Sequence, residues 1–175
     1  LGALAIFPAI ALELLGESMF GEMNSSDVVS SGFHAFFVVG LSEELCKFAV
    51  LLWYAYRKSD FNEPFDGIVY AVMVSMGFAT LENIMYVLDG GISTALLRMF
   101  LSVPAHASFA IIMGYFVGMA KFRGGEALAL MVTGLLAASV LHGFFDFFLF
   151  LANTPLLAIG ALFSLVIGLY LSNRV

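Results

Sequence analysis

Long apolar runs separated by short polar breaks dominate the sequence. A transmembrane helix needs about 20 predominantly apolar residues, and most of the runs are near or above that length. They lie at residues 1–16, 31–56, 66–88, 93–120, 126–151 and 155–172. The breaks between them contain Gly, Asn, Ser, Asp or Pro, which are typical of turns. The pattern predicts an all-α, polytopic membrane helical bundle of about six transmembrane helices, to which a longer chain could add more.

Composition supports this prediction and excludes other classes. Of the 175 residues, 62% are apolar and 11% are charged, whereas a soluble domain is about half apolar and a quarter charged. The chain is therefore expected to lie almost entirely in a lipid bilayer. A formal net charge of −6 excludes a nucleic-acid-binding protein, which would need a basic patch. With no internal repeat and no long linker, residues 1–175 are expected to form a single transmembrane domain.

Positive charges predict the orientation in the membrane. Lys and Arg follow the second, fourth and sixth apolar runs. No cation lies in the loops after the first, third and fifth runs, and the loops after the first and third runs carry acidic residues. The five cations are Arg57, Lys58, Lys121, Arg123 and Arg174. Because such residues stay on the cytoplasmic side, we expect both the N- and the C-terminus to be cytoplasmic.

Seven ionisable side chains are predicted to lie at membrane depth. A charged group at the bilayer centre costs about 2.5–3.5 kcal/mol on insertion scales, so these groups are expected to face one another or a wet cavity. They are Glu43, Glu44, Lys47, Glu82, His106, His142 and Asp146. At a rise of 1.5 Å per residue, the glutamates and histidines of four different helices lie within about 10 Å of one depth. The sequence therefore predicts one polar layer in the middle to outer half of the membrane.

Local spacing suggests how some of these groups support one another. Glu43 and Lys47 are four residues apart on one helix face, and so are His142 and Asp146, so that each pair can touch. Asp146 could then orient the ring of His142. Arg98 lies near the outer start of the fourth run, where we expect it to be paired rather than to signal topology.

Three kinds of function fit such a constellation. Glutamates and histidines without a serine beside a base indicate general acid/base hydrolysis, in which a carboxylate activates water. Two histidines and one glutamate also form a common catalytic zinc site, here His106 and His142 with Glu43 or Glu44. Because the chain has no HExxH motif, the metal-free reading with no cofactor is favoured. A transporter with a proton relay, or a partner-binding membrane protein, is the non-enzymatic alternative.

Four segments carry a resemblance to a known family. They are "EELCK" at 43–47, "DGIVYAVMVSMGFATLENIMYV" at 66–87, "LLRMFLSVPAHA" at 96–107 and "LHGFFD" at 141–146. In this order they resemble the PrsW family of intramembrane proteases, within the superfamily that includes CAAX prenyl proteases and bacteriocin-immunity-type proteins. The resemblance implies cleavage of a single-span membrane protein, such as an anti-sigma factor in a site-1-type cut, in a bacterial or archaeal plasma membrane.

The resemblance also implies roles for individual residues. Glu43 would activate water with His106 as its partner, and His142 would form or support the oxyanion site. Glu44 shares the glutamate pair, and whether Glu43 or Glu44 is the base stays open. The expected supporting residues are Lys47, Glu82, Asn83, Asp146 and Arg98.

Overall fold

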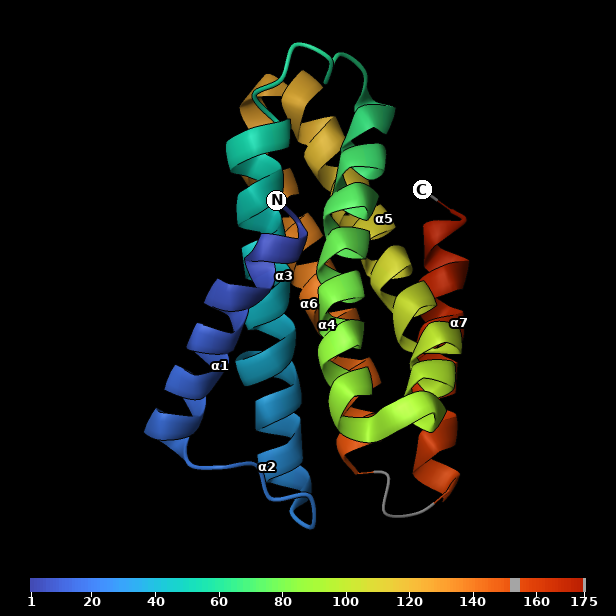
Figure 1. Ribbon diagram of the computed structural model, residues 1–175. Helices are drawn as coiled ribbons and strands as arrows, with labels where there is room; N and C mark the ends of the chain where they lie inside the picture. Colours follow the sequence, from blue (N-terminus) through green and yellow to red (C-terminus); the bar gives the residue numbers. More distant parts are fainter. Residues whose placement is uncertain (152–154, 175) are drawn as a thin grey trace.

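The computed structural model describes residues 1–151 and 155–174, and the regular secondary structure of these residues is entirely helical (Figure 1). The α-helices are α1 (Ile6–Phe20), α2 (Val28–Phe33), α3 (Leu41–Val50), α4 (Pro64–Phe100), α5 (Ser102–Phe122), α6 (Ala127–Phe150) and α7 (Pro155–Ser172). Two 3₁₀ turns, η1 (Ala3–Ala5) and η4 (Gly124–Glu126), and two π-helical segments, η2 (His34–Gly40) and η3 (Leu51–Ala55), adjoin them. The predicted all-α fold is confirmed.

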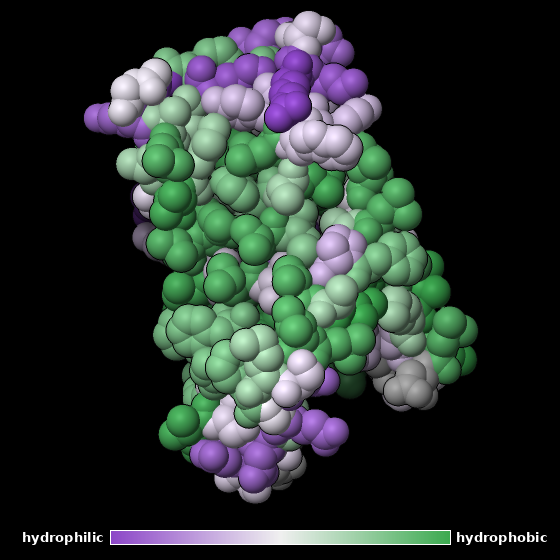
Figure 2. Space-filling model, turned by 90° about the vertical axis from the view of Figure 1, so that its left-hand side faces the viewer, coloured by the Kyte–Doolittle hydropathy of each residue, from purple (hydrophilic) through white to green (hydrophobic). Residues whose placement is uncertain are grey.

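Within the described residues, four helical segments are long and apolar enough to cross a membrane. They are Ala3–Phe20, Pro64–Leu88, Gly90–Phe122 and Gly124–Phe150. The other two predicted spans are helical as well: one runs from α2 through η3, and the other is α7. Hydrophobic side chains form a broad band between hydrophilic ends on the face shown in Figure 2. The protein is a polytopic helical membrane protein.

The helical run from α2 to η3 places the paired glutamates. Its central part, α3, lies between the π-helical segments η2 and η3, and π-turns are frequent beside functional sites. Gly40, at the end of η2, lets α6 come close, because a Cβ there would lie 3.1 Å from the backbone nitrogen of Gly143. This close packing brings the first turn of α3 against the middle of α6.

Helices α4 and α5 approach each other through glycines. A Cβ on Gly67 would meet the backbone of both Gly114 and Gly118, and small residues allow such contact between membrane helices. Helix α4 begins at Pro64 with a capping box in which Glu63 and Asp66 bind each other's backbone N–H groups. The antiparallel crossing sets the relative depth of side chains further along both helices.

The fourth predicted span, 93–120, is bent and does not form one straight helix. The chain bends at Gly91, where φ is 71° and ψ is −165°, a conformation that glycine adopts at little cost. The following residues, up to Phe100, lie across the lower end of the bundle in Figure 1, and a second bend at Leu101 precedes α5. The apolar pattern continues through this crossing segment, so the pattern alone did not reveal the bend. Arg98 belongs to the crossing segment that precedes α5.

Candidate active site

Four buried side chains from three helices meet in the middle of the bundle. Glu43 and Glu44 extend from α3, His106 from α5 and His142 from α6, and each is at most 5% exposed. One nitrogen or carboxylate oxygen from each lies within 4.8 Å of those of the other three. These four predicted site residues therefore lie close together, and their depth in the membrane stays a prediction.

Lys47 occupies the centre of this cluster. Its Nζ donates to Oε2 of Glu43 at 3.0 Å, to Oε1 of Glu44 at 2.8 Å and to Nδ1 of His106 at 3.1 Å. The ammonium also lies 4.2 Å from the ring centroid of Phe78. All three N–H groups are used, and one positive charge faces two carboxyl groups. The acceptor atoms of three residues thus converge on a single space that holds a cation.

Hydrogen bonding defines which nitrogen of His106 carries its proton. An ammonium can only donate, so Nδ1 of His106 accepts from Lys47 and Nε2 is the protonated nitrogen. Nε2 donates to Oε2 of Glu82 at 2.9 Å. The other oxygen of Glu82 pairs with Arg98 at 2.8 Å. Glu82 therefore orients His106 from outside the cluster.

Arg98 connects the crossing segment to this network. Its guanidinium donates to Oδ1 of Asn83 at 2.5 Å and to Oγ of Ser102 at 3.1 Å, and it lies 3.9 Å from the ring centroid of Tyr86. The expected pairing of Arg98 is found. Arg98 is thus linked to His106 through Glu82, and Asn83 is linked to Arg98.

His142 is held in a similar way. Its Nδ1 lies 2.9 Å from Oε1 of Glu44, and its Nε2 lies 3.2 Å from Oδ2 of Asp146 and 3.9 Å from Oε2 of Glu43. The ring stacks on Phe109 with centroids 5.3 Å apart. Each histidine therefore has a carboxylate on one nitrogen and the cluster on the other, which is how proteins commonly orient metal-binding histidines.

The donor atoms fit a metal ion. In a tetrahedral zinc site with bonds of about 2.0–2.2 Å, neighbouring ligand atoms are about 3.3 Å apart. The four candidate ligand atoms lie within 4.8 Å of one another, so a small contraction would suffice. The ammonium of Lys47 fills that space now. A metal ion and this ammonium would therefore compete for the same lone pairs.

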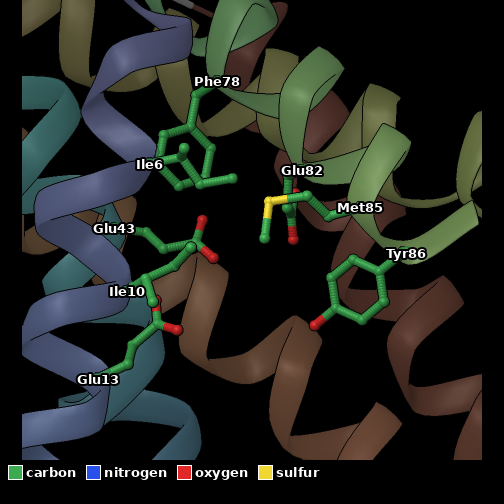
Figure 3. A pocket seen from close by; sticks show the side chains of 8 residues that line it. All are labelled: Ile6, Ile10, Glu13, Glu43, Phe78, Glu82, Met85 and Tyr86. Carbon is green, nitrogen blue, oxygen red and sulfur yellow. The ribbon is translucent and has the colours of Figure 1, made fainter. Parts of the chain in front are cut away.

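Sequence reasoning missed Glu13 on α1. With Glu43 and Glu82 it lines a cleft between α1 and α4 (Figure 3). The available signal was a carboxyl group inside an apolar run, but it stood close to the predicted end of the run at residue 16, where charged groups are common. The helix instead continues to Phe20, so that Glu13 lies well inside it.

A bundle of apolar helices in which two glutamates and two histidines meet in the buried interior has the form of an intramembrane enzyme. Residues 1–172 match the family model described as "PrsW family intramembrane metalloprotease". The chain belongs to this family. No solved structure matches it.

Curated relatives agree with the family assignment. "Protease PrsW" of Geobacillus kaustophilus is 39% identical over 150 residues, which are 85% of this chain and 63% of the relative. "Protease PrsW" of Halalkalibacterium halodurans is 34% identical over 169 residues, covering 95% of this chain and 75% of the relative. The protein of the same name from Bacillus subtilis is 37% identical over 152 residues, with 85% and 66% covered. The chain thus spans about two thirds of the length of some of these relatives.

The expectation that the site needs no cofactor is wrong. The family is described as a metalloprotease family, and the buried cluster offers four ligand atoms. The missing HExxH motif misled the sequence reasoning. That motif supplies ligands from one helix, whereas here the four side chains come from α3, α5 and α6.

Proposed function

We propose that the protein is a metal-dependent intramembrane endopeptidase that cuts single-span membrane proteins. The observation that carries this proposal is the buried group of Glu43, Glu44, His106 and His142, whose donor atoms lie within 4.8 Å of one another. Membership of a metalloprotease family supports it. Zinc is the metal that this ligand chemistry favours, because two histidines and a carboxylate are a common catalytic zinc set.

The surroundings of the two glutamates distinguish their roles. Glu44 is 1% exposed and contacts Lys47 and His142, so with His106 and His142 it would hold the metal. Glu43 lines the open cleft, where a water molecule and a substrate can reach it. The chemistry that zinc supplies at such a site is polarisation of a carbonyl group and acidification of water.

Glu43 would move the proton during hydrolysis. Its carboxylate takes a proton from water as the water oxygen bonds to the scissile carbonyl carbon, and it returns this proton to the amine nitrogen as the C–N bond breaks. In the metal-free cluster Glu43 pairs with Lys47 at 3.0 Å. Glu82 and Asp146 keep the rings of His106 and His142 in position.

The substrate would be cut near the outer surface of a bacterial membrane. Both termini are assigned to the cytoplasm from the distribution of Lys and Arg, which places the end of the bundle with the crossing segment outside. A substrate helix must unwind before its carbonyl groups can react, and unpaired backbone in lipid is costly. Cleavage is therefore expected in the outer juxtamembrane turns of a single-span substrate, of the kind that an anti-sigma factor represents.

The test uses the purified full chain in lipid nanodiscs with a single-span reporter that carries two glycines in its outer juxtamembrane turn. The unsubstituted protein should hold one zinc ion per chain by elemental analysis and cut the reporter at that turn by mass spectrometry. Glu43→Gln should keep the zinc but lose about 10²–10⁴-fold in rate. His106→Ala should lose both the zinc and the cleavage activity. Glu22→Gln, at an exposed position, should change neither the zinc content nor the cleavage rate. Full activity after removal of all metal would overturn the proposal.

A further inference from the structure

An open cleft between α1 and α4 leads from the outside of the bundle to the central cluster. Its volume is about 320 Å³. It is lined by Ile6, Ile10, Glu13, Glu43, Phe78, Glu82, Met85 and Tyr86 (Figure 3). A second cavity of about 240 Å³ contains His106 and His142 and shares four of these lining residues. The cleft is therefore continuous with the site described above.

Glu13 differs from the other glutamates around the cleft. Glu43 and Glu82 each have ion-pair partners, whereas Glu13 makes no hydrogen bond and no ion pair with any residue in the described part of the chain. Figure 3 shows its carboxyl group and the hydroxyl of Tyr86 pointing into the cleft from opposite sides. A polar group at this depth in a membrane is costly without a partner, so a partner from outside the bundle would stabilise it.

We propose that this cleft binds the unwound segment of the substrate helix, and that the Glu13 carboxyl group accepts a hydrogen bond from a backbone N–H of that segment. This inference rests on the proposed proteolytic function. An unwound segment has unpaired N–H and C=O groups that lipid cannot satisfy. The Glu13 carboxyl group accepts a hydrogen bond from one of these N–H groups, and the Tyr86 hydroxyl donates a hydrogen bond to one of these C=O groups.

Size and lining of the cleft agree with this occupant. A helix with its side chains is about 10–12 Å across, which is too wide for a cleft of about 320 Å³. A short extended segment fits, because its side chains point alternately to both sides. Ile6, Ile10 and Met85 would contact these side chains, so the cleft favours apolar residues beside the scissile bond.

Photo-crosslinking tests the location of the substrate. p-Benzoylphenylalanine replaces Ile10 in the Glu43→Gln protein, which should bind the glycine-containing reporter and cut it only slowly. We expect a cross-link to reporter residues next to the scissile bond. The matched control carries the same group in place of Leu15, which is 53% exposed and lies five residues along α1, on a different face.

The outcomes separate this inference from the proposed function. No cross-link from Ile10, or an equal one from Leu15, would refute the cleft as the substrate site even if the unsubstituted protein cuts the reporter. A missing cross-link from Ile10 is also the result expected if lipid, or another part of a longer protein, filled the cleft in place of the substrate. Because cross-linking requires neither metal nor turnover, a failure of metal-dependent cleavage would not imitate this result.

Substitution of Glu13 tests the hydrogen bond. Glu13→Leu removes the acceptor at similar size and should raise KM for the reporter by roughly 3- to 10-fold, with a smaller change in kcat. Glu13→Gln keeps a carbonyl acceptor and should stay close to the unsubstituted protein. Zinc content should be unchanged in both variants. If Glu13 instead supported the metal cluster structurally, its substitution should lower the zinc content. An unchanged KM in Glu13→Leu, or a loss of zinc, would contradict the assignment.

Discussion

At the scale of single residues, the central feature of the site is Lys47, whose ammonium group is surrounded by hydrogen-bond acceptors. Lys47 is 2% exposed, and its ammonium group donates hydrogen bonds to Glu43, Glu44 and His106. Removing one partner of a buried ion pair typically costs about 3–5 kcal/mol, because the remaining charge is left without compensation. Two of these acceptors, Glu44 and His106, are also proposed metal ligands. A metal ion and Lys47 should therefore substitute for each other in stabilising the cluster.

Lys47→Met tests this competition. The metal-free variant should lose about 3–5 kcal/mol of stability, and added zinc should raise its Tm more than it raises the Tm of the unsubstituted protein. Thermal melts with chelator and with zinc measure both effects. Lys58→Met is the matched control, because Lys58 is exposed in the loop before α4 and should change stability by less than about 0.5 kcal/mol. An equal zinc effect in Lys47→Met and the unsubstituted protein would show that the two cations do not compete.

At the scale of elements, the crossing of α4 and α5 determines which side chains share a depth. Gly67 on α4 packs against Gly114 and Gly118 on α5. On the same two helices, further toward the end of the bundle with the crossing segment, Glu82 meets His106 at 2.9 Å. Because both helices are rigid, a change in their separation at the glycines would be transmitted to this hydrogen bond.

Gly67→Ala should separate the two helices. The added methyl group meets backbone atoms that cannot move aside, and such overpacking typically costs about 1–3 kcal/mol. Reporter cleavage should also slow, since Glu82 would hold His106 less well. Gly124→Ala adds the same group where nothing lies within 4 Å and should leave both measurements unchanged. If melting and cleavage were the same in both variants, the glycine contact would not control the site.

At the scale of the whole molecule, the loops that carry Lys and Arg gather at one end of the bundle. The loop between η3 and α4 and the loop between α5 and α6 lie together at the upper end in Figure 1, and the chain between α1 and α2 lies at the opposite end with the crossing segment. Lys and Arg are found in the two upper loops. The proposed orientation places this end in the cytoplasm and the substrate cleft toward the outer half of the membrane.

Cysteine labelling tests this orientation. Cys46 is buried and is the single cysteine, so Cys46→Ala provides a background without labelling sites. In intact cells, Ser26→Cys in the chain between α1 and α2 should react with a membrane-impermeant maleimide. Ser59→Cys, before α4, should react only after the cells are opened. The reverse pattern would invert the topology and move the expected cut to the cytoplasmic side.

Much of the fold was predictable from the sequence, because the bilayer imposes one strong rule. Spanning helices must be long and apolar, so the apolar runs marked the helices, and the cost of charge in lipid indicated that Glu43, Glu44, His106 and His142 would meet. The family resemblance in their four motifs agreed. The pair of His142 and Asp146 was also predictable, since residues four apart on a helix touch.

Contacts between helices could not be predicted in this way. The pairing of Glu82 with His106 depends on the α4–α5 crossing, and the position of Arg98 depends on the bends at Gly91 and Leu101. Glu13 joined the cleft only because α1 packs beside α4. The choice of a metal over a metal-free site was likewise hidden, because the candidate ligands come from three helices and have no common spacing.

By itself, the sequence determined a helical membrane protein with ionisable residues at one depth, because hydropathy and helix periodicity act along the chain. Only the tertiary structure decided which of these residues contact one another, where Lys47 lies and which surface opens toward Glu43. The physical reason is that the bilayer constrains the length and composition of each helix, whereas the rotation and separation of helices follow from side-chain packing between segments far apart in sequence.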